Sequence, residues 1–138
     1  YTKAIELEPG FAIAYSNRGA AKTDLKDFKG ALSDLNKAIE LAPQDAGSYY
    51  NRGIVKADLE DLKGAIADYD KAIESFNNSL SLKDDDYFSD DCYYFIGYSN
   101  YKKGNLSSAK DAMETLISKY PDSTYKKDAE DFIKVNLK

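Results

Sequence analysis

The stretch AIAYSNRGAAKTDLKDFKGALSDLNKAIELAPQD, residues 12–45, is followed at once by a second version of itself, AGSYYNRGIVKADLEDLKGAIADYDKAIESFNNS, residues 46–79. Seventeen of the 34 aligned positions are identical, far more than chance gives at this length. A third copy at 90–123 follows a ten-residue offset, and residues 1–11 match the end of a copy. A fixed period of this size predicts repeated units that stack on one another.

Each copy is predicted to form two antiparallel helices. In the first copy the apolar spacing runs to about residue 25 and restarts at Phe28, with Asp27 between. Asp61 and Asn105 occupy the same turn position in the other copies, so each of the three side chains is expected to cap a second helix.

A glycine recurs inside the first helix of each copy, where it costs about 1 kcal/mol relative to alanine. The repetition of that cost indicates close helix packing that a side chain would block. We expect small residues of the second helix to provide the facing contact. The glycines are Gly19, Gly53 and Gly97, and the small residues are Ala31, Ala65 and Ala109.

These markers resemble the tetratricopeptide repeat (TPR), whose pattern is W-x2-L-G-x2-Y, then A-x3-F, then P. The matching positions are Tyr15, Gly19, Ala31, Leu35, Ala38 and Pro43; Tyr49, Gly53, Ala65, Tyr69 and Ala72; and Tyr93, Gly97, Ala109, Met113 and Pro121. The resemblance covers residues 1–123 and implies an all-α, right-handed solenoid of antiparallel helix pairs. Four positions depart from the pattern, namely Arg18, Arg52, Lys22 and Lys56. We expect the stems of these side chains to pack along the surface with the charged heads in water.

We therefore predict a single TPR-like domain over residues 1–138. Its parts are the end of a preceding repeat at 1–11, repeats at 12–45, 46–79 and 90–123, an insertion at 80–89, and a capping helix at 124–138. The capping helix is indicated by one amphipathic face of Tyr125, Ala129, Phe132, Ile133 and Asn136. Because Tyr1 falls inside a repeat, we expect further residues upstream in the parent protein and a homodimer through the uncovered N-terminal end.

The composition argues against several classes of function. The chain has no histidine and one cysteine, Cys92, so Ser-His-Asp, Cys-His and Cys/His zinc sites are excluded. Nucleotide-binding glycine motifs are missing. The acidic cluster of Asp84, Asp85, Asp86, Asp90 and Asp91 lacks the spacing of a calcium loop. A net charge of −5 disfavours nucleic acid, and no apolar stretch has the roughly 20 residues needed to span a bilayer. We expect no enzyme activity, cofactor, metal, nucleic-acid partner or membrane insertion. The compartment stays open between cytoplasm and bacterial envelope.

Aromatic residues are unusually dense between 87 and 101, where seven tyrosine and phenylalanine side chains occur. The family resemblance implies that first-helix positions soon after the marker tyrosine line a concave groove. On that basis the candidate peptide-binding residues are Asn17, Asp24, Tyr50, Asn51, Asp58, Tyr94, Phe95 and Tyr98. The expected function is a scaffold that binds a partner peptide or helix in this groove. The alternative is a structural spacer or self-association module within a longer protein.

Overall fold

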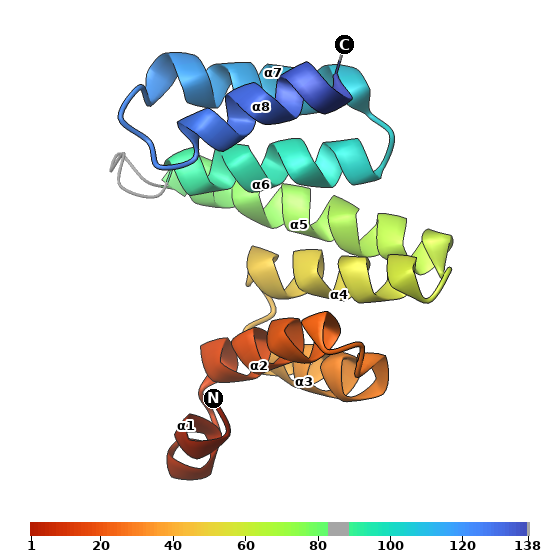
Figure 1. The fold of residues 1–138 in the computed structure, drawn as a ribbon. Coiled ribbons are helices and arrows are strands. Elements are labelled where there is room, and N and C mark those ends of the chain that lie inside the picture. The colour runs from red at the N-terminus through yellow and green to blue at the C-terminus, as the bar shows by residue number, and fades with distance from the viewer. Residues whose placement is uncertain (83–88, 138) are drawn as a thin grey trace. The chain divides into compact units, whose positions relative to one another are not determined.

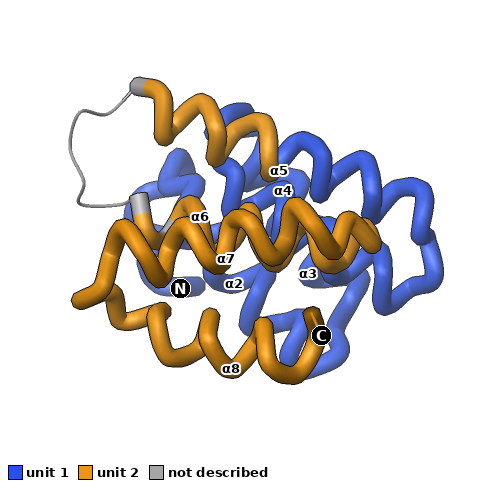
Figure 2. Tube along the Cα trace, turned by 90° about the horizontal axis from the view of Figure 1, so that it is seen from above, with its two compact units in different colours: residues 1–72 blue, residues 73–138 orange. Residues whose placement is uncertain are grey.

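The computed structural model describes residues 1–82 and 89–137, and over these ranges the chain is helical with no strand. The predicted all-α class is confirmed. The chain divides into two compact units, Tyr1–Ala72 and Ile73–Lys138, which Figure 2 shows in different colours. The acidic run 84–86 lies outside the described residues.

The first unit consists of helices joined by short turns (Figure 1). They are α1 (Thr2–Leu7), α2 (Ala12–Asp24), α3 (Phe28–Leu41), α4 (Ala46–Asp58) and the part of α5 (Leu62–Leu82) that ends at Ala72. Helices α2 and α3 form an antiparallel pair, and α4 packs against both of them.

The second unit starts with the remainder of α5, which continues to Leu82, so residues 80–82 of the expected insertion are helical. It continues with α6 (Ser89–Lys102), α7 (Leu106–Lys119) and α8 (Lys126–Asn136). Helices α6 and α7 form the antiparallel pair, and α8 packs against α7 (Figure 1). The predicted amphipathic helix at the C-terminal end of the chain is therefore present and covers this pair.

The turn inside each helix pair has the same backbone form but different side-chain contacts. Asp27 and Asp61 accept hydrogen bonds of 3.0 Å from backbone N–H groups at the start of α3 and α5. Asn105 occupies the matching position before α7, but its side chain makes no capping hydrogen bond, so that part of the prediction is wrong. Asn105 places a neutral amide where the other copies have a carboxylate, and a carboxylate makes the stronger hydrogen bonds to N–H groups.

The helical glycines do mark close contacts, but the facing side chain is large. A Cβ atom on Gly53 would lie 2.6 Å from Cε1 of Tyr69, and one on Gly97 would lie 2.7 Å from Cε of Met113. The predicted small facing residues are fully buried, yet they are not the side chains nearest to the glycines. Each glycine instead leaves room for a bulky side chain of the second helix, four positions after the expected small residue.

Each unit has its own apolar core. In the first, Ala31, Leu35 and Val55 form a buried cluster that Phe28 and Leu32 cover from the side. In the second, α7, α8 and the residue after α8 supply the buried residues, and the tyrosines of α6 pack against them. The buried members are Ala109, Met113, Leu116, Ala129, Phe132 and Leu137.

Candidate functional site

Five of the candidate residues belong to the first unit, on the neighbouring helices α2 and α4. Asn17 and Asn51 occupy equivalent positions of these helices; the first is exposed and the second is half-buried. Asp24 and Asp58 end the two helices and are both exposed. Tyr50 is half-buried because its ring packs against the buried ring of Tyr69, with the centroids 6.0 Å apart.

The other three candidates lie on α6 in the second unit, and they do not all face the same neighbour. Tyr94 stacks on Tyr125 with ring centroids 4.4 Å apart, and Tyr98 packs on Phe132 at 4.5 Å. Both partners belong to the segment at the start of α8 or to α8 itself. All three candidate rings are half-buried, so α8 accounts for part of the aromatic density of α6.

Phe95 has a different environment from the two tyrosines. Its ring stacks on Phe76 of α5, with centroids 5.6 Å apart and planes 9° from parallel. Tyr94 and Tyr98 are four residues apart and share one helix face, whereas Phe95 is turned about 100° away from Tyr94 around the helix. The two tyrosines therefore belong to one surface of α6. Phe95 packs toward α5 and also meets the ring of Tyr125 edge-on at 6.3 Å.

An open groove of about 320 Å³ lies between α6 and α8, which we call the α6–α8 groove. Tyr94, Tyr98 and Phe132 provide its aromatic lining. Its remaining lining residues come from α8 and are Asp128, Asp131, Val135 and Asn136. The groove thus combines aromatic rings with carboxylates and one apolar side chain, Val135, that is 76% exposed.

The contribution of α8 to this groove was missed by reasoning from sequence. The amphipathic pattern of the segment 124–138 predicts a packing face, and Phe132 lies on it. Asp128, Asp131 and Val135 follow one another at helical spacing beside that face, which is the signal that could have found them. The pattern along this helix predicts a cover for the last repeat but does not indicate that these side chains lie opposite Tyr94 and Tyr98.

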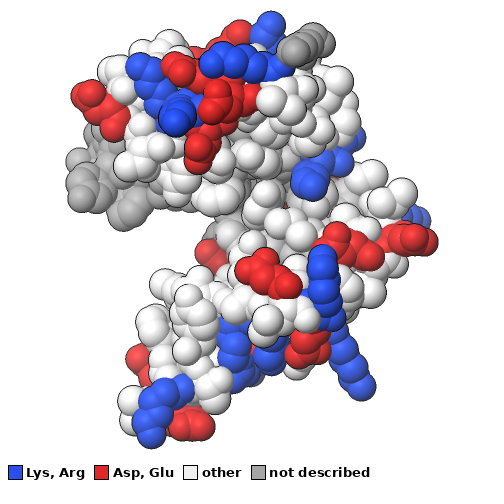
Figure 3. Space-filling model, in the orientation of Figure 1, with Lys and Arg blue, Asp and Glu red and all other residues white. Residues whose placement is uncertain are grey.

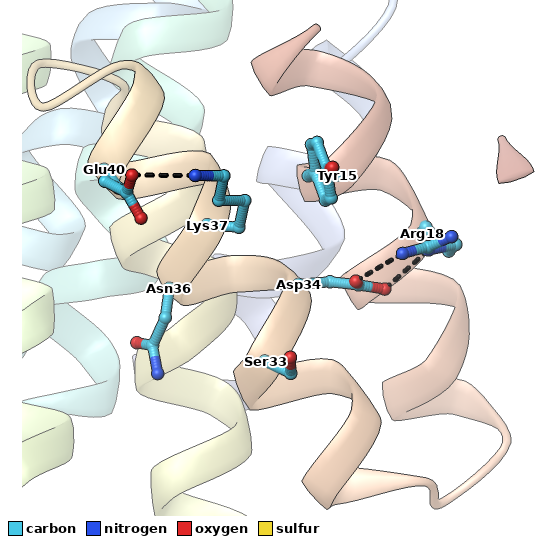
Figure 4. A pocket seen from close by; sticks show the side chains of 7 residues that line it. All are labelled: Tyr15, Arg18, Ser33, Asp34, Asn36, Lys37 and Glu40. Carbon is cyan, nitrogen blue, oxygen red and sulfur yellow. Dashed lines mark hydrogen bonds and ion pairs between the residues drawn. The ribbon is translucent and has the colours of Figure 1, made fainter. Parts of the chain in front are cut away.

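The first unit carries a more polar depression of about 450 Å³, drawn in Figure 4. Its charged side chains are already paired with one another. Arg18 donates two hydrogen bonds of 2.7 Å to Asp34, and Lys37 Nζ lies 2.7 Å from Glu40 Oε1 (Figure 4). A charged ligand would have to displace these partners, so this depression is a weaker candidate than the α6–α8 groove.

The arginines and lysines that depart from the repeat pattern do not extend freely into water, which corrects the sequence prediction. Asp34 is 4% exposed and is held by both Arg18 and Lys22, the latter at 2.8 Å. Arg52 and Lys56 bind Asp68 in the same way, at 2.7 and 2.8 Å. A buried carboxylate requires such partners because its desolvation is otherwise costly.

The pKa values of these carboxyls follow from their surroundings. Burial by itself would raise the pKa of Asp34 and of Asp68. Hydrogen bonds and charge from the arginine and lysine beside each one outweigh burial, so both pKa values lie below the ordinary aspartate range. The same contacts raise the pKa values of Arg18 and Arg52. All of these groups are charged at neutral pH, which fits a structural role in joining the two helices of each pair.

No arrangement for metal binding or membrane crossing is present in the described ranges. No group of three or more acidic or cysteine side chains there could hold a metal ion. Within residues 1–82 and 89–137, no helix is both long enough and apolar enough to span a bilayer. Cys92 is buried, like Ala14 and Ser48 at the same position of the other copies.

Family comparisons agree with the helix pairs. Models described as tetratricopeptide repeat match residues 12–45, 46–86 and 91–123, which together make up most of the chain. The chain belongs to the tetratricopeptide repeat family. No curated protein sequence matches it.

Several solved structures share the fold. YrrB, described as a TPR protein with an unusual peptide-binding site, matches with a TM-score of 0.58 and 26% identity over 85% of this chain, and the chain spans 55% of YrrB. The N-terminal domain of stress-induced protein-1 from C. elegans matches with a TM-score of 0.52 and 25% identity, covering 87% of this chain and 92% of that domain. The Arabidopsis OM64 TPR domain has a TM-score of 0.55 and 20% identity over 89% of this chain and 93% of its own length, which shows the fold alone.

Proposed function

We propose that this chain is a non-catalytic scaffold that holds a peptide or helix of a partner protein against its first-helix surfaces. Repeats of this family generally serve as protein-interaction scaffolds, and YrrB is described as having a peptide-binding site. In the first unit the proposed surface includes Asn17 and Asn51, whose amides can bond a partner's backbone. In the second unit it is the α6–α8 groove.

The observation that carries the proposal is the half-buried pair Tyr94 and Tyr98, which line the open α6–α8 groove. Tyrosine offers a large contact area at a small cost in conformational entropy, so it is enriched among residues that dominate binding energy. These rings pack against the core of the second unit on one side and line a groove with carboxylates beside them on the other. Asp24 and Asp58 add exposed negative charge in the first unit and favour partners with basic residues.

The test begins with selection of peptides from a random library on the purified chain, followed by fluorescence anisotropy with the selected sequences. We expect Tyr94→Ala/Tyr98→Ala to raise Kd by about tenfold or more, as loss of a binding hot spot does. Because these rings also pack on α8, Val135→Asn provides a second variant at an exposed groove position. Leu106→Ala, at the exposed first residue of α7, is the matched control.

Circular dichroism must first show that every variant keeps the helix content of the wild type. Selected peptides that bind the groove variants and the wild type equally well would disprove a role for this groove. A chain that selects no peptide at all would instead support the alternative function, a structural spacer within a longer protein.

Self-association through the N-terminal end is a second candidate. Helix α1 has no buried residue, and Leu7 and Ile13 are 76% and 60% exposed. Pairing of two chains would remove this apolar surface from water. Sedimentation analysis of the wild type against Leu7→Ser/Ile13→Ser tests the idea, because a dimer should dissociate in the variant. A wild-type chain that stays monomeric at high concentration would rule it out.

A further inference from the structure

We propose that the α6–α8 groove recognises an arginine side chain of the partner segment, with an apolar residue of that segment beside it. This proposal rests on the peptide-binding function proposed above. It names the type of side chain that the α6–α8 groove selects in the partner peptide. It concerns the second unit alone, where all lining residues of the groove belong to α6 and α8.

The aromatic lining is a fixed platform. The rings of Tyr94 and Tyr98 lie 4.9 Å apart, and each is also held by a second ring, Tyr125 at 4.4 Å or Phe132 at 4.5 Å. Tyr101 meets Phe132 edge-on at 5.0 Å and donates a hydrogen bond to Asn136 on α8. Rings supported from behind in this way lose little freedom when a planar group packs against them.

The charged residues that line the groove, Asp128 and Asp131, are both acids. Asp131 pairs with Lys134 at 3.4 Å, but both side chains are more than half exposed, so the pair is weak and a partner could displace the lysine. Figure 3 shows acidic and basic side chains close together in the region of α8. Charge complementarity in the groove therefore favours a cation.

The first unit holds two examples of an arginine between a tyrosine ring and an aspartate. The guanidinium carbon of Arg18 lies 5.6 Å from the ring centroid of Tyr15 while its nitrogens bind Asp34. Arg52 repeats the arrangement with Tyr49 and Asp68. The α6–α8 groove presents tyrosine rings and aspartates without an arginine of its own among its lining residues. A guanidinium stacks on aromatic faces and binds carboxylates through two parallel bonds, whereas an ammonium is a more strongly hydrated point charge.

Val135 supplies the apolar half of the site. Its side chain is largely exposed at the groove, next to the carboxylates of the same helix face. An exposed β-branched residue beside an aromatic platform gives an adjacent leucine or isoleucine of the partner a surface to cover. The groove thus fits an arginine flanked by an aliphatic residue.

The test uses the pentapeptide acetyl-Ser-Leu-Arg-Leu-Ser-amide as the probe, titrated into the full chain and followed by NMR. The matched peptide replaces arginine by citrulline, which has nearly the same shape and no charge. We expect the arginine peptide to shift signals of Tyr98, Asp128 and Val135 and to bind about tenfold more tightly than the citrulline peptide. A lysine peptide should bind more weakly than the arginine peptide.

Variants separate recognition at the groove from the overall charge of the chain. Asp128→Asn/Asp131→Asn should abolish the preference for arginine over citrulline. The control variant Asp111→Asn/Glu114→Gln, on α7, removes the same number of negative charges and breaks one weak ion pair between Glu114 and a lysine. It should leave the preference for arginine intact. Equal binding of the arginine and citrulline peptides to the wild type would overturn the proposal. So would an equal loss of the preference for arginine in the α8 double variant and in the α7 double variant.

Failure of this inference can be told apart from failure of the proposed function. If library peptides without arginine lose binding in Tyr94→Ala/Tyr98→Ala, the groove binds peptides and the choice of arginine is wrong. If neither the library peptides nor the probe responds to any groove variant, both proposals are wrong.

Discussion

At Gly53 of α4, the ring of Tyr69 lies where a side chain would begin, whereas at Gly97 the flexible end of Met113 lies there. We expect Gly53→Ala to lower the free energy of unfolding by about 1–2 kcal/mol, because overpacking against a rigid ring outweighs the helix propensity of alanine. Gly97→Ala should stay within about 1 kcal/mol of the wild type, since a methionine side chain can move aside. Urea unfolding followed by circular dichroism measures both.

Gly47→Ala serves as the control for this comparison. A Cβ atom there would meet nothing closer than 3.8 Å, so alanine should stabilise α4 slightly. Equal unfolding midpoints for Gly53→Ala and Gly47→Ala would show that the Tyr69 contact does not limit the size of residue 53.

The lowered pKa values of Asp34 and Asp68 make stability depend on pH. Each carboxyl binds a proton less readily in the folded chain than in the unfolded chain. Their contribution is therefore fully present above the unfolded pKa of about 4 and is lost as the pH falls through the lower, folded pKa. We expect the urea midpoint to fall on acidification below about pH 4 to 5. In Asp34→Asn/Asp68→Asn the urea midpoint should be lower at neutral pH and should change less on acidification. If the midpoint of this variant changes with pH as steeply as that of the wild type, these two carboxyls do not cause the pH dependence.

At the scale of the helix pair, the third copy has replaced the whole ion cluster. Arg52, Lys56 and Asp68 of the second copy correspond to Ile96, Asn100 and Ala112, which are all buried. Asn100 donates a hydrogen bond to the backbone carbonyl of Ile96 and needs no charged partner. The same helix pair can therefore be joined either by ions or by apolar packing.

This exchange predicts how substitutions combine. Asp68→Ala alone leaves two cations near the interior without their carboxylate and should cost about 3 kcal/mol. Arg52→Ile/Lys56→Asn/Asp68→Ala, which installs the residues of the third copy, should cost less than the single change, because no unpaired charge is left. Urea unfolding of both variants measures the difference. A triple variant less stable than the single one would mean that the two helix pairs are not interchangeable.

At the scale of the whole molecule, the chain consists of two compact units with separate apolar cores. In repeat proteins stability is set by units and their nearest neighbours, so one part can open while another stays folded. We expect hydrogen exchange by mass spectrometry to show Gly53→Ala reducing protection mainly in residues 1–72. Phe132→Ala, which truncates a buried ring of the other core, should act mainly on 73–138. Uniform loss of protection along the chain in either variant would indicate one cooperative unit.

The helix pairs, their turns and the family could be derived from the sequence because they depend on local spacing and on a period repeated along the chain. The amphipathic pattern near the C-terminal end likewise indicates α8. These features depend on residues close in sequence, whose contacts follow from helix geometry.

Tertiary structure alone decided the partners of side chains that meet across larger separations. Arg18 appeared to be a solvated surface residue until Asp34, sixteen residues away on the next helix, was seen to bind it. Tyr94 and Tyr98 gave an aromatic signal, but only the position of α8 turns them into a groove with Asp128 and Val135. A side chain's partner depends on how helices are brought together in space, and the spacing within one helix does not contain that information.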